Sequence, residues 1–155
     1  INIGELHFDP ILHNGYKEIQ NLEADLLSSQ ELIKWSDHLV VIFPTWWGST
    51  PAILKGFFDR TFIPGFAFKY IPNSRFWNKL LKGKSARIIT TMDGPSFYYK
   101  YFAGAPGIKM MKKSILEFCG FSPVKYNIIG SLKFLSQKQK EFKLQEIFKL
   151  GTKAK

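Results

Sequence analysis

The sequence is poor in cysteine: Cys119 is the only one among 155 residues. A single thiol excludes an intrachain disulfide framework and suits a reducing cytoplasm, which is the compartment we expect. Cys119 lies in the apolar segment 115–121, which contains no histidine and no cationic residue. We therefore interpret it as a buried packing residue and not as a nucleophile.

Long apolar runs are also lacking. No stretch reaches the length of a membrane span and no signal-peptide pattern opens the chain, so membrane insertion is not expected. Acidic residues are few, with 12 Asp and Glu against 22 Lys and Arg, which gives a formal net charge of +10. No nucleic-acid-binding motif accompanies this charge, so nucleic acid is not an expected partner. No metal site is predicted.

What is present suits a single folded domain over residues 1–155, because 45% of the residues are hydrophobic and 22% are charged. Strands are predicted at 39–43, 86–91 and 124–129. The first of them is a continuous apolar run that ends at Pro44, which is typical of a parallel strand covered on both faces.

Helices are predicted between these strands. The first is expected to be capped by Ser28 or Ser29, and the second to open at Thr50-Pro51. The third is expected to begin at Pro106 or Gly107 and to stop at Gly120.

The tail, 136–150, is predicted to be an amphipathic helix that ends at Gly151, with three apolar residues turned inward: Phe142, Ile147 and Phe148. Strands spaced by helices indicate an α/β fold with a doubly wound parallel sheet. Ligands of such sheets bind at the carboxyl ends of the strands, where the chain order reverses. A ligand site is therefore expected in the loops after Phe43, Thr91 and Ile129.

The loop 44–51 reads PTWWGSTP and places two tryptophans directly after a buried strand. Exposing them to water is unfavourable, so something is expected to cover them. One interpretation is that a neighbouring helix or subunit does so. The other is that the loop forms one wall of a site for a flat ring and turns its backbone N–H groups toward the polar edge of that ring.

The segment 90–99 reads TTMDGPSFYY and follows the second strand. Small and polar residues come first and two tyrosines follow. Alone, this is a common kind of Gly- and Pro-containing loop. Beside the tryptophan loop, it supplies a second set of donors at the same end of the sheet.

The stretch Phe43 to Tyr70, FPTWWGSTPAILKGFFDRTFIPGFAFKY, resembles the signature of the flavodoxin-like NAD(P)H dehydrogenase (quinone) family, and ARIITTMDGPSFYY and SILEFCGF match it later in the chain. The resemblance implies strand order 2-1-3-4-5, a noncovalent FMN (or FAD) and NAD(P)H as co-substrate. It also implies that the flavin ring is bordered by Pro44, Thr45, Trp46, Trp47 and Gly48, with Thr90, Thr91, Met92 and Asp93 along its pyrimidine edge.

By the same resemblance, Tyr98 is the catalytic tyrosine near the part of the flavin that becomes negatively charged. Phe68 and Tyr70 match aromatic residues that reach toward the partner's flavin in family homodimers and shape the acceptor pocket. Phe68 also suits a plain core or interface position. The activity implied is hydride transfer from NAD(P)H to a quinone or a similar flat acceptor.

The sequence departs from the family in several places. The histidines His7, His13 and His38 all lie outside the loop that follows Met92, where the quinone reductases often have one, and Met92-Asp93 stand where glycines are frequent. Residues 1–6 resemble the family's second strand, so the first strand and its phosphate-binding loop are missing. The chain opens with Ile1, and we expect it to be an N-terminally incomplete part of a longer protein. Two alternative functions are a non-catalytic flavodoxin-like scaffold or electron carrier, and a module that regulates a transporter.

Overall fold

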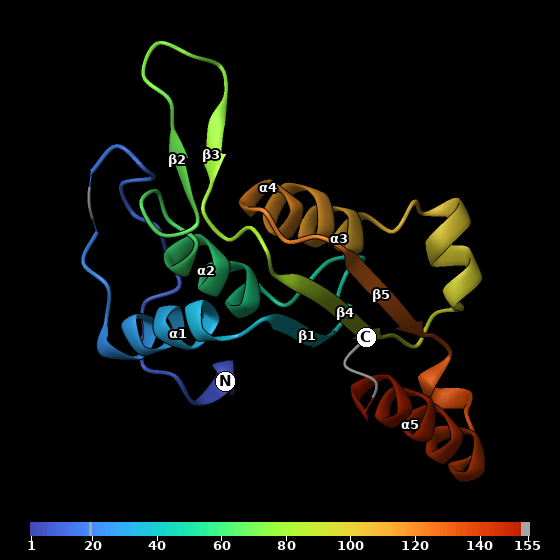
Figure 1. Cartoon of the computed structure of the whole chain (residues 1–155). Coiled ribbons are helices and arrows are strands. Elements are labelled where there is room, and N and C mark those ends of the chain that lie inside the picture. Colours follow the sequence, from blue (N-terminus) through green and yellow to red (C-terminus); the bar gives the residue numbers. More distant parts are fainter. Residues whose placement is uncertain (19, 153–155) are drawn as a thin grey trace.

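A three-stranded parallel sheet organises the fold (Figure 1). The computed structural model describes residues 1–18 and 20–152. Strands β1 (His38–Pro44), β4 (Ser85–Thr91) and β5 (Val124–Ile129) lie in the order β1-β4-β5. All three predicted strands are confirmed, and their order is that of the last three strands of a flavodoxin-like sheet.

The helices α1 (Ala24–Trp35) and α2 (Ala52–Thr61) follow the N-terminal segment and β1. Between β4 and β5 lie a π-helix (Tyr98–Phe102), α3 (Pro106–Lys109), a second π-helix (Met110–Leu116) and α4 (Glu117–Cys119). The chain ends with α5 (Gln137–Thr152). Among the described residues, no helix is both long and apolar enough to cross a membrane.

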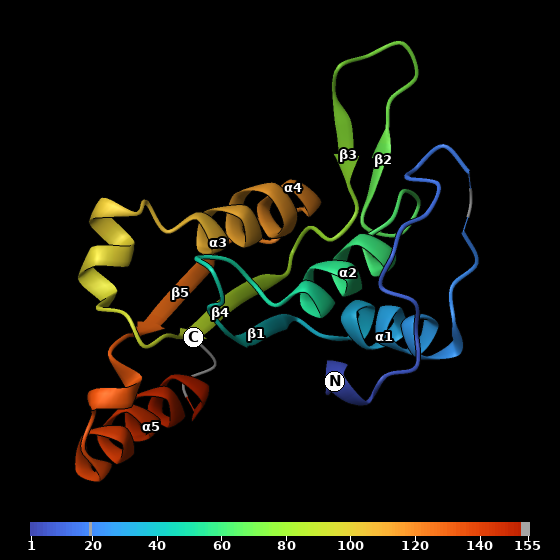
Figure 2. The same ribbon diagram turned by 180° about the vertical axis from the view of Figure 1, so that it is seen from behind.

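The main core lies between one face of the sheet and helices α2 and α4, with α1 packed against α2 (Figures 1 and 2). Val41, Phe43 and Ile88 point into this core from the sheet. Cys119 is buried here, as the sequence predicted. Burial raises the pKa of its thiol to about 12, so the thiol stays protonated at neutral pH.

The prediction that both faces of β1 are buried is wrong for the described part of the chain. Val40 and Ile42 point away from the core and are exposed, Ile42 to 67%. β1 pairs only with β4, so its other edge has no strand beside it in the described part of the chain. An apolar cavity of about 370 Å³ borders this edge.

The N-terminus also differs from the prediction, because residues 1–6 contain a 3-10 helix (Ile3–Glu5) where a strand was expected. A strand is stable only if its backbone N–H and C=O groups find partners on a neighbouring strand. No described strand lies beside residues 1–6, whereas in the 3-10 helix the Asn2 side chain accepts a hydrogen bond from the Gly4 N–H at 3.3 Å.

Two helix predictions also need correction. Helix α1 begins at Ala24, and Ser29 lies inside it with its hydroxyl donating to the Asp25 carbonyl at 2.7 Å, so neither Ser28 nor Ser29 is the cap. Helix α5 is amphipathic, but Phe142 and Phe148 are exposed and not turned inward, and the helix continues past Gly151.

A short antiparallel hairpin, β2 (Phe68–Tyr70) with β3 (Trp77–Lys79), was not predicted. It projects beyond α2 and α4 on the side away from α5 (Figures 1 and 2). The Trp77 indole of β3 stacks on Phe118, with ring centroids 4.3 Å apart, and its N–H donates to the Phe118 carbonyl.

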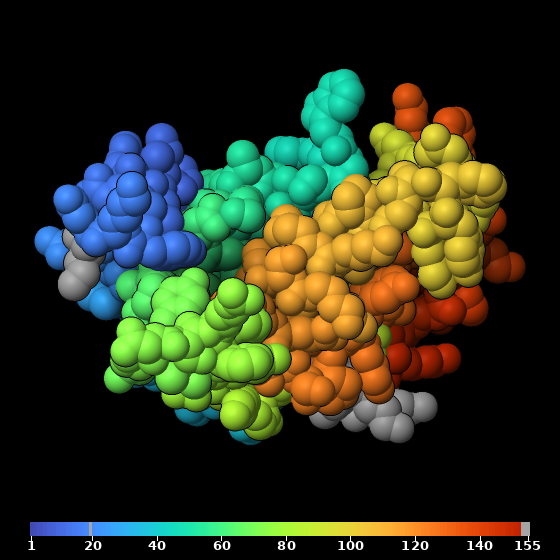
Figure 3. Space-filling model, turned by 90° about the horizontal axis from the view of Figure 1, so that it is seen from above, coloured from blue at the N-terminus to red at the C-terminus, as the bar shows by residue number. Residues whose placement is uncertain are grey.

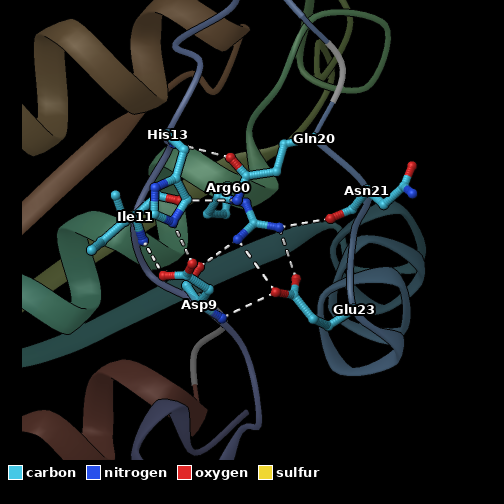
Figure 4. Close-up of polar contacts among 7 residues, drawn as sticks. All are labelled: Asp9, Ile11, His13, Gln20, Asn21, Glu23 and Arg60. Atoms are coloured by element: carbon cyan, nitrogen blue, oxygen red, sulfur yellow. Dashed lines mark hydrogen bonds and ion pairs between the residues drawn. The ribbon is translucent and has the colours of Figure 1, made fainter.

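A buried arginine ties the N-terminal segment to the rest of the fold (Figure 4). Arg60 on α2 is only 1% exposed. Its guanidinium donates to both carboxylate oxygens of Glu23, at 2.8 and 3.3 Å, and to the backbone carbonyls of Asp9 and Asn21. Arg60 therefore ties Asp9, Asn21 and Glu23 to α2 by hydrogen bonds from its charged guanidinium.

Candidate functional site at the carboxyl ends of the strands

The structure brings together the two loops selected from the sequence. Pro44 at the end of β1 pairs with Thr91 at the end of β4, so the loops that follow start side by side. Thr45 joins them, since its N–H donates to the Thr91 carbonyl at 2.7 Å and its hydroxyl shares a 2.7 Å hydrogen bond with the Thr90 hydroxyl. Thr90 is fully buried and supports the site from beneath.

The tryptophan loop is a tight turn. The N–H of Trp46 donates to the Ser49 carbonyl at 3.0 Å, and the N–H of Ser49 donates to the Trp46 carbonyl at 2.9 Å. Between them, Trp47 and Gly48 both have positive φ, 50° and 75°. This turn fixes the path of the backbone while leaving both indoles outside it.

Both tryptophans are uncovered. Trp46 is 60% exposed and Trp47 is fully exposed. The expectation that a neighbouring helix covers them is therefore wrong for the described part of the chain. In the space-filling view, a teal projection with the colour of residues 45–50 stands out from the surface (Figure 3). Two large apolar rings facing solvent directly after β1 mark a surface that suits a partner or a ligand.

In the second loop, Met92 differs from the prediction that it lines the edge of a ring. The Met92 side chain is buried, its N–H donates to the Ile129 carbonyl, and its own carbonyl accepts from the Leu132 N–H. The neighbouring Asp93 is exposed, and one of its carboxylate oxygens accepts from the Lys133 N–H at 3.2 Å. Met92 therefore packs beneath the site, whereas Asp93 presents a charge at its surface.

The two adjacent tyrosines of this loop point in opposite directions. Tyr98 is 58% exposed and its ring stacks on Phe102, with the centroids 5.8 Å apart. Tyr99 is 7% exposed, and its hydroxyl donates to the Gly48 carbonyl at 2.9 Å. Burial raises the pKa of Tyr99, against the effect of the N–H groups that its oxygen faces, so it is a neutral donor at neutral pH.

Phe68 and Tyr70 do not join this cluster within one chain. Both lie on β2, in the hairpin away from the strand ends (Figure 1). Phe68 is buried in the main core, where its ring meets Tyr16, Tyr70 and Phe118 edge to face. Tyr70 is exposed, so of the two only Tyr70 presents a broad surface to a second molecule.

The residues at the strand ends fit a flat ring with hydrogen-bond acceptors at its edge. Within the described residues, the backbone N–H groups of Trp47, Gly48, Asp93 and Gly94 have no acceptor. These donors come from two neighbouring loops, and the exposed indoles offer flat apolar surface beside them. The described residues hold no group of three His, Cys, Asp or Glu side chains that suits a metal ion.

A parallel sheet with such loops at its carboxyl ends defines a flavodoxin-like α/β protein, and residues 1–149 match the family described as having the flavodoxin-like fold. The chain belongs to this family.

Two of the proteins to which the chain is similar carry the names of redox enzymes. The chain is 32% identical, over 142 residues, to ribosyldihydronicotinamide dehydrogenase (quinone) of Mus musculus, covering 85% of this chain and 58% of that one. It is 27% identical to an uncharacterized NAD(P)H oxidoreductase of Haemophilus influenzae, covering 88% of this chain and 69% of that one. The solved structure of Smu.1420 from Streptococcus mutans superposes with a TM-score of 0.75 at 36% identity, covering 93% of this chain and 76% of that one. The chain thus spans less than two thirds of the mouse relative.

Tyr99, whose hydroxyl contacts the tryptophan turn, was not among the residues predicted for the site. In the sequence Tyr99 stands next to Tyr98, and nothing in this pattern indicates which of the two tyrosines is buried. Gly107 was not predicted for the site either, and its N–H donates to both the Gly48 carbonyl and the Tyr99 hydroxyl, each at 3.1 Å. The glycine at this position was read only as a candidate helix start.

Proposed function

We propose that the protein is a flavin-dependent NAD(P)H oxidoreductase that passes hydride from NAD(P)H to a quinone or a similar flat acceptor. The observation that carries the proposal is the pair of loops at the ends of β1 and β4, where N–H groups without an acceptor among the described residues lie beside two exposed indoles. The names of the relatives, an NAD(P)H oxidoreductase and a quinone dehydrogenase, support the same chemistry. FMN is the proposed cofactor, with FAD as the alternative.

A bound flavin supplies the redox chemistry, and the protein supplies position and electrostatics. The turn from Trp46 to Ser49 is proposed to form one wall of the ring site. The N–H groups of Trp47 and Gly48 donate to the edge of the ring from this wall. Thr91 and the N–H groups of Asp93 and Gly94 are proposed to line the other side.

Tyr98 is proposed to contact the part of the flavin that becomes negatively charged in the reaction. Its hydroxyl makes no hydrogen bond with the described residues, so it is available to donate to negative charge that develops in the reaction. Asp93 is proposed to accept a hydrogen bond from a ring N–H, and its negative charge disfavours an anionic ring. Changing Tyr98→Phe is expected to slow turnover, and an unchanged rate would remove it from the mechanism.

The proposal includes a homodimer in the cytoplasm. Tyr70 is the exposed aromatic of the hairpin and is proposed to reach the ring site of the second copy, whereas Phe68 is buried in the core of its own chain and takes no part in this contact. Light scattering after size-exclusion chromatography tests this: a particle of twice 17.9 kDa supports the dimer, and a monomer contradicts it.

The decisive experiment is a visible absorption spectrum of the purified protein, recorded before and after NADPH is added without oxygen. Flavin bands that bleach are the expected result. If no flavin binds after FMN or FAD is added, the oxidoreductase proposal fails and the rival functions gain: a non-catalytic flavodoxin-like scaffold, or a module that regulates a transporter. Bound flavin that NADPH does not reduce would point to an electron carrier.

A further inference from the structure

Tyr99 lies at a junction of three segments. Its hydroxyl donates to the carbonyl of Gly48 at 2.9 Å and accepts from the N–H of Gly107 at 3.1 Å. The same Gly107 N–H also lies 3.1 Å from the Gly48 carbonyl. The tryptophan turn, the first π-helix and the start of α3 therefore meet at one phenol oxygen.

The ring of Tyr99 is itself fixed. It belongs to a small second core with Met92, Ala105 and Ile108, against which Ile128 packs. Its backbone N–H donates to the Pro95 carbonyl at 3.2 Å, and its backbone carbonyl accepts from the Ala105 N–H at 2.8 Å. Since the side chain and both backbone groups are held, the hydroxyl has little freedom to move.

The tryptophan turn has few other attachments. Trp47 is fully exposed and so contributes no packing to the position of the turn. Apart from the hydrogen bonds inside the turn and those of Thr45 to Thr91 and Thr90 at its start, the described hydrogen bonds that hold its far side are those of the Gly48 carbonyl to Tyr99 and Gly107. Losing the phenol oxygen would leave one of these two.

The space at this junction is tight. A Cβ built on Gly107 would lie 2.9 Å from the Ser49 Cα, 3.0 Å from the Gly48 oxygen and 3.1 Å from the Tyr99 oxygen. Only glycine therefore allows the turn and helix α3 to approach this closely. The phenol and the glycine act together to set the distance between the two segments.

We propose that Tyr99 is a positioning residue that fixes the turn from Trp46 to Ser49, and so fixes the wall that its N–H groups present to a flat ring. The assignment separates the neighbouring tyrosines: Tyr98 faces the ligand, and Tyr99 shapes the site from inside. Both tyrosines lie in the π-helix Tyr98–Phe102, and π-turns are frequent at functional sites. The part that concerns ligand binding rests on the proposed function.

The test compares Tyr99→Phe with Tyr126→Phe as a matched control, since the Tyr126 hydroxyl makes no hydrogen bond with the described residues. The first readout is amide hydrogen exchange of Ser49 and Gly107 without any flavin. In Tyr99→Phe we expect these amides to exchange about fivefold to tenfold faster relative to Ile88 in β4, which is the factor that one net hydrogen bond contributes. A uniform acceleration that includes Ile88 would show a merely structural role and overturn the proposal.

The second readout is FMN binding by fluorescence titration, where we expect Tyr99→Phe to raise the Kd about fivefold or more and Tyr126→Phe to leave it unchanged. If wild-type protein binds no FMN, the proposed function fails, and the exchange experiment still decides whether Tyr99 positions the turn. If wild-type protein binds FMN and Tyr99→Phe binds it equally well with unchanged exchange, the positioning role is overturned. Gly107→Ala is a second variant, expected to loosen the same two amides.

Discussion

The ion pair between Arg60 and Glu23 gives a sharp test of what holds the N-terminal segment in place. Glu23→Gln keeps the size of the side chain and one oxygen acceptor but removes the negative charge that faces a guanidinium only 1% exposed. Breaking a buried ion pair on one side costs about 3–5 kcal/mol. The Glu23 side chain is 33% exposed, so water takes over part of its role, and we expect a loss of about 1–3 kcal/mol.

The pH dependence of this loss follows from the pKa of Glu23. Burial of the carboxyl acts to raise that pKa, but the N–H of Asp9 and its own backbone N–H, together with Arg60, hold it below the usual value. The folded state therefore binds the proton more weakly than the unfolded state does. The stabilisation is present above the unfolded pKa and is lost as the pH falls through the folded pKa. The difference between wild type and Glu23→Gln should shrink in that acidic range.

Urea unfolding followed by circular dichroism, at neutral pH and at several acidic values, measures both effects. Glu31→Gln is the control, because the Lys34–Glu31 pair lies on the surface and its loss should change stability by less than about 0.5 kcal/mol. A Glu23→Gln variant as stable as this control at neutral pH would refute the reasoning. So would a loss that stays constant as the pH falls.

Three further predictions concern the core and the site. Met111→Ala, at a fully buried position, should lower the free energy of unfolding by about 2–5 kcal/mol in urea titrations, and a loss below about 1 kcal/mol would contradict the packing described. Cys119, with a pKa of about 12, should resist a thiol reagent at neutral pH in the native protein and react after unfolding; fast native labelling would contradict its burial. Trp47→Ala should change stability by less than about 0.5 kcal/mol because the described residues leave the indole fully exposed, yet it should weaken FMN binding in fluorescence titrations; unchanged binding would remove Trp47 from the proposed site.

The three strands of the sheet were predictable because each is a short apolar run between loop residues. Burial of a helix face was not predictable in the same way. The spacing of Phe142, Ile147 and Phe148 indicates a helix, and α5 is one, but spacing carries no information about what the helix packs against. The hairpin of β2 and β3 was not predictable because each of its strands has three residues and the loop between them lacks the usual two-residue turn sequence.

The candidate site was predictable as a pair of loops, because the carboxyl ends of parallel strands meet at one edge of the sheet. The roles within the loops were harder to assign. Tyr98 and Tyr99 are adjacent and chemically identical, and which of them is buried depends on the packing of the folded chain, where Tyr99 joins a small core. The covering expected for Trp46 and Trp47 followed from the cost of exposing indoles, and the described chain leaves them in solvent.

The free edge of β1 in the described residues has a consequence for how this 155-residue chain behaves on its own at high concentration. An exposed, apolar strand edge is a template for pairing with another chain, and in the described part of the chain β1 offers one beside an apolar cavity. The net charge of +10 opposes such contact through mutual repulsion between molecules. Salt at physiological strength screens charges beyond about 8 Å. Clear solutions at low ionic strength should therefore turn cloudy as salt is added, opposite to the salting-in of many proteins.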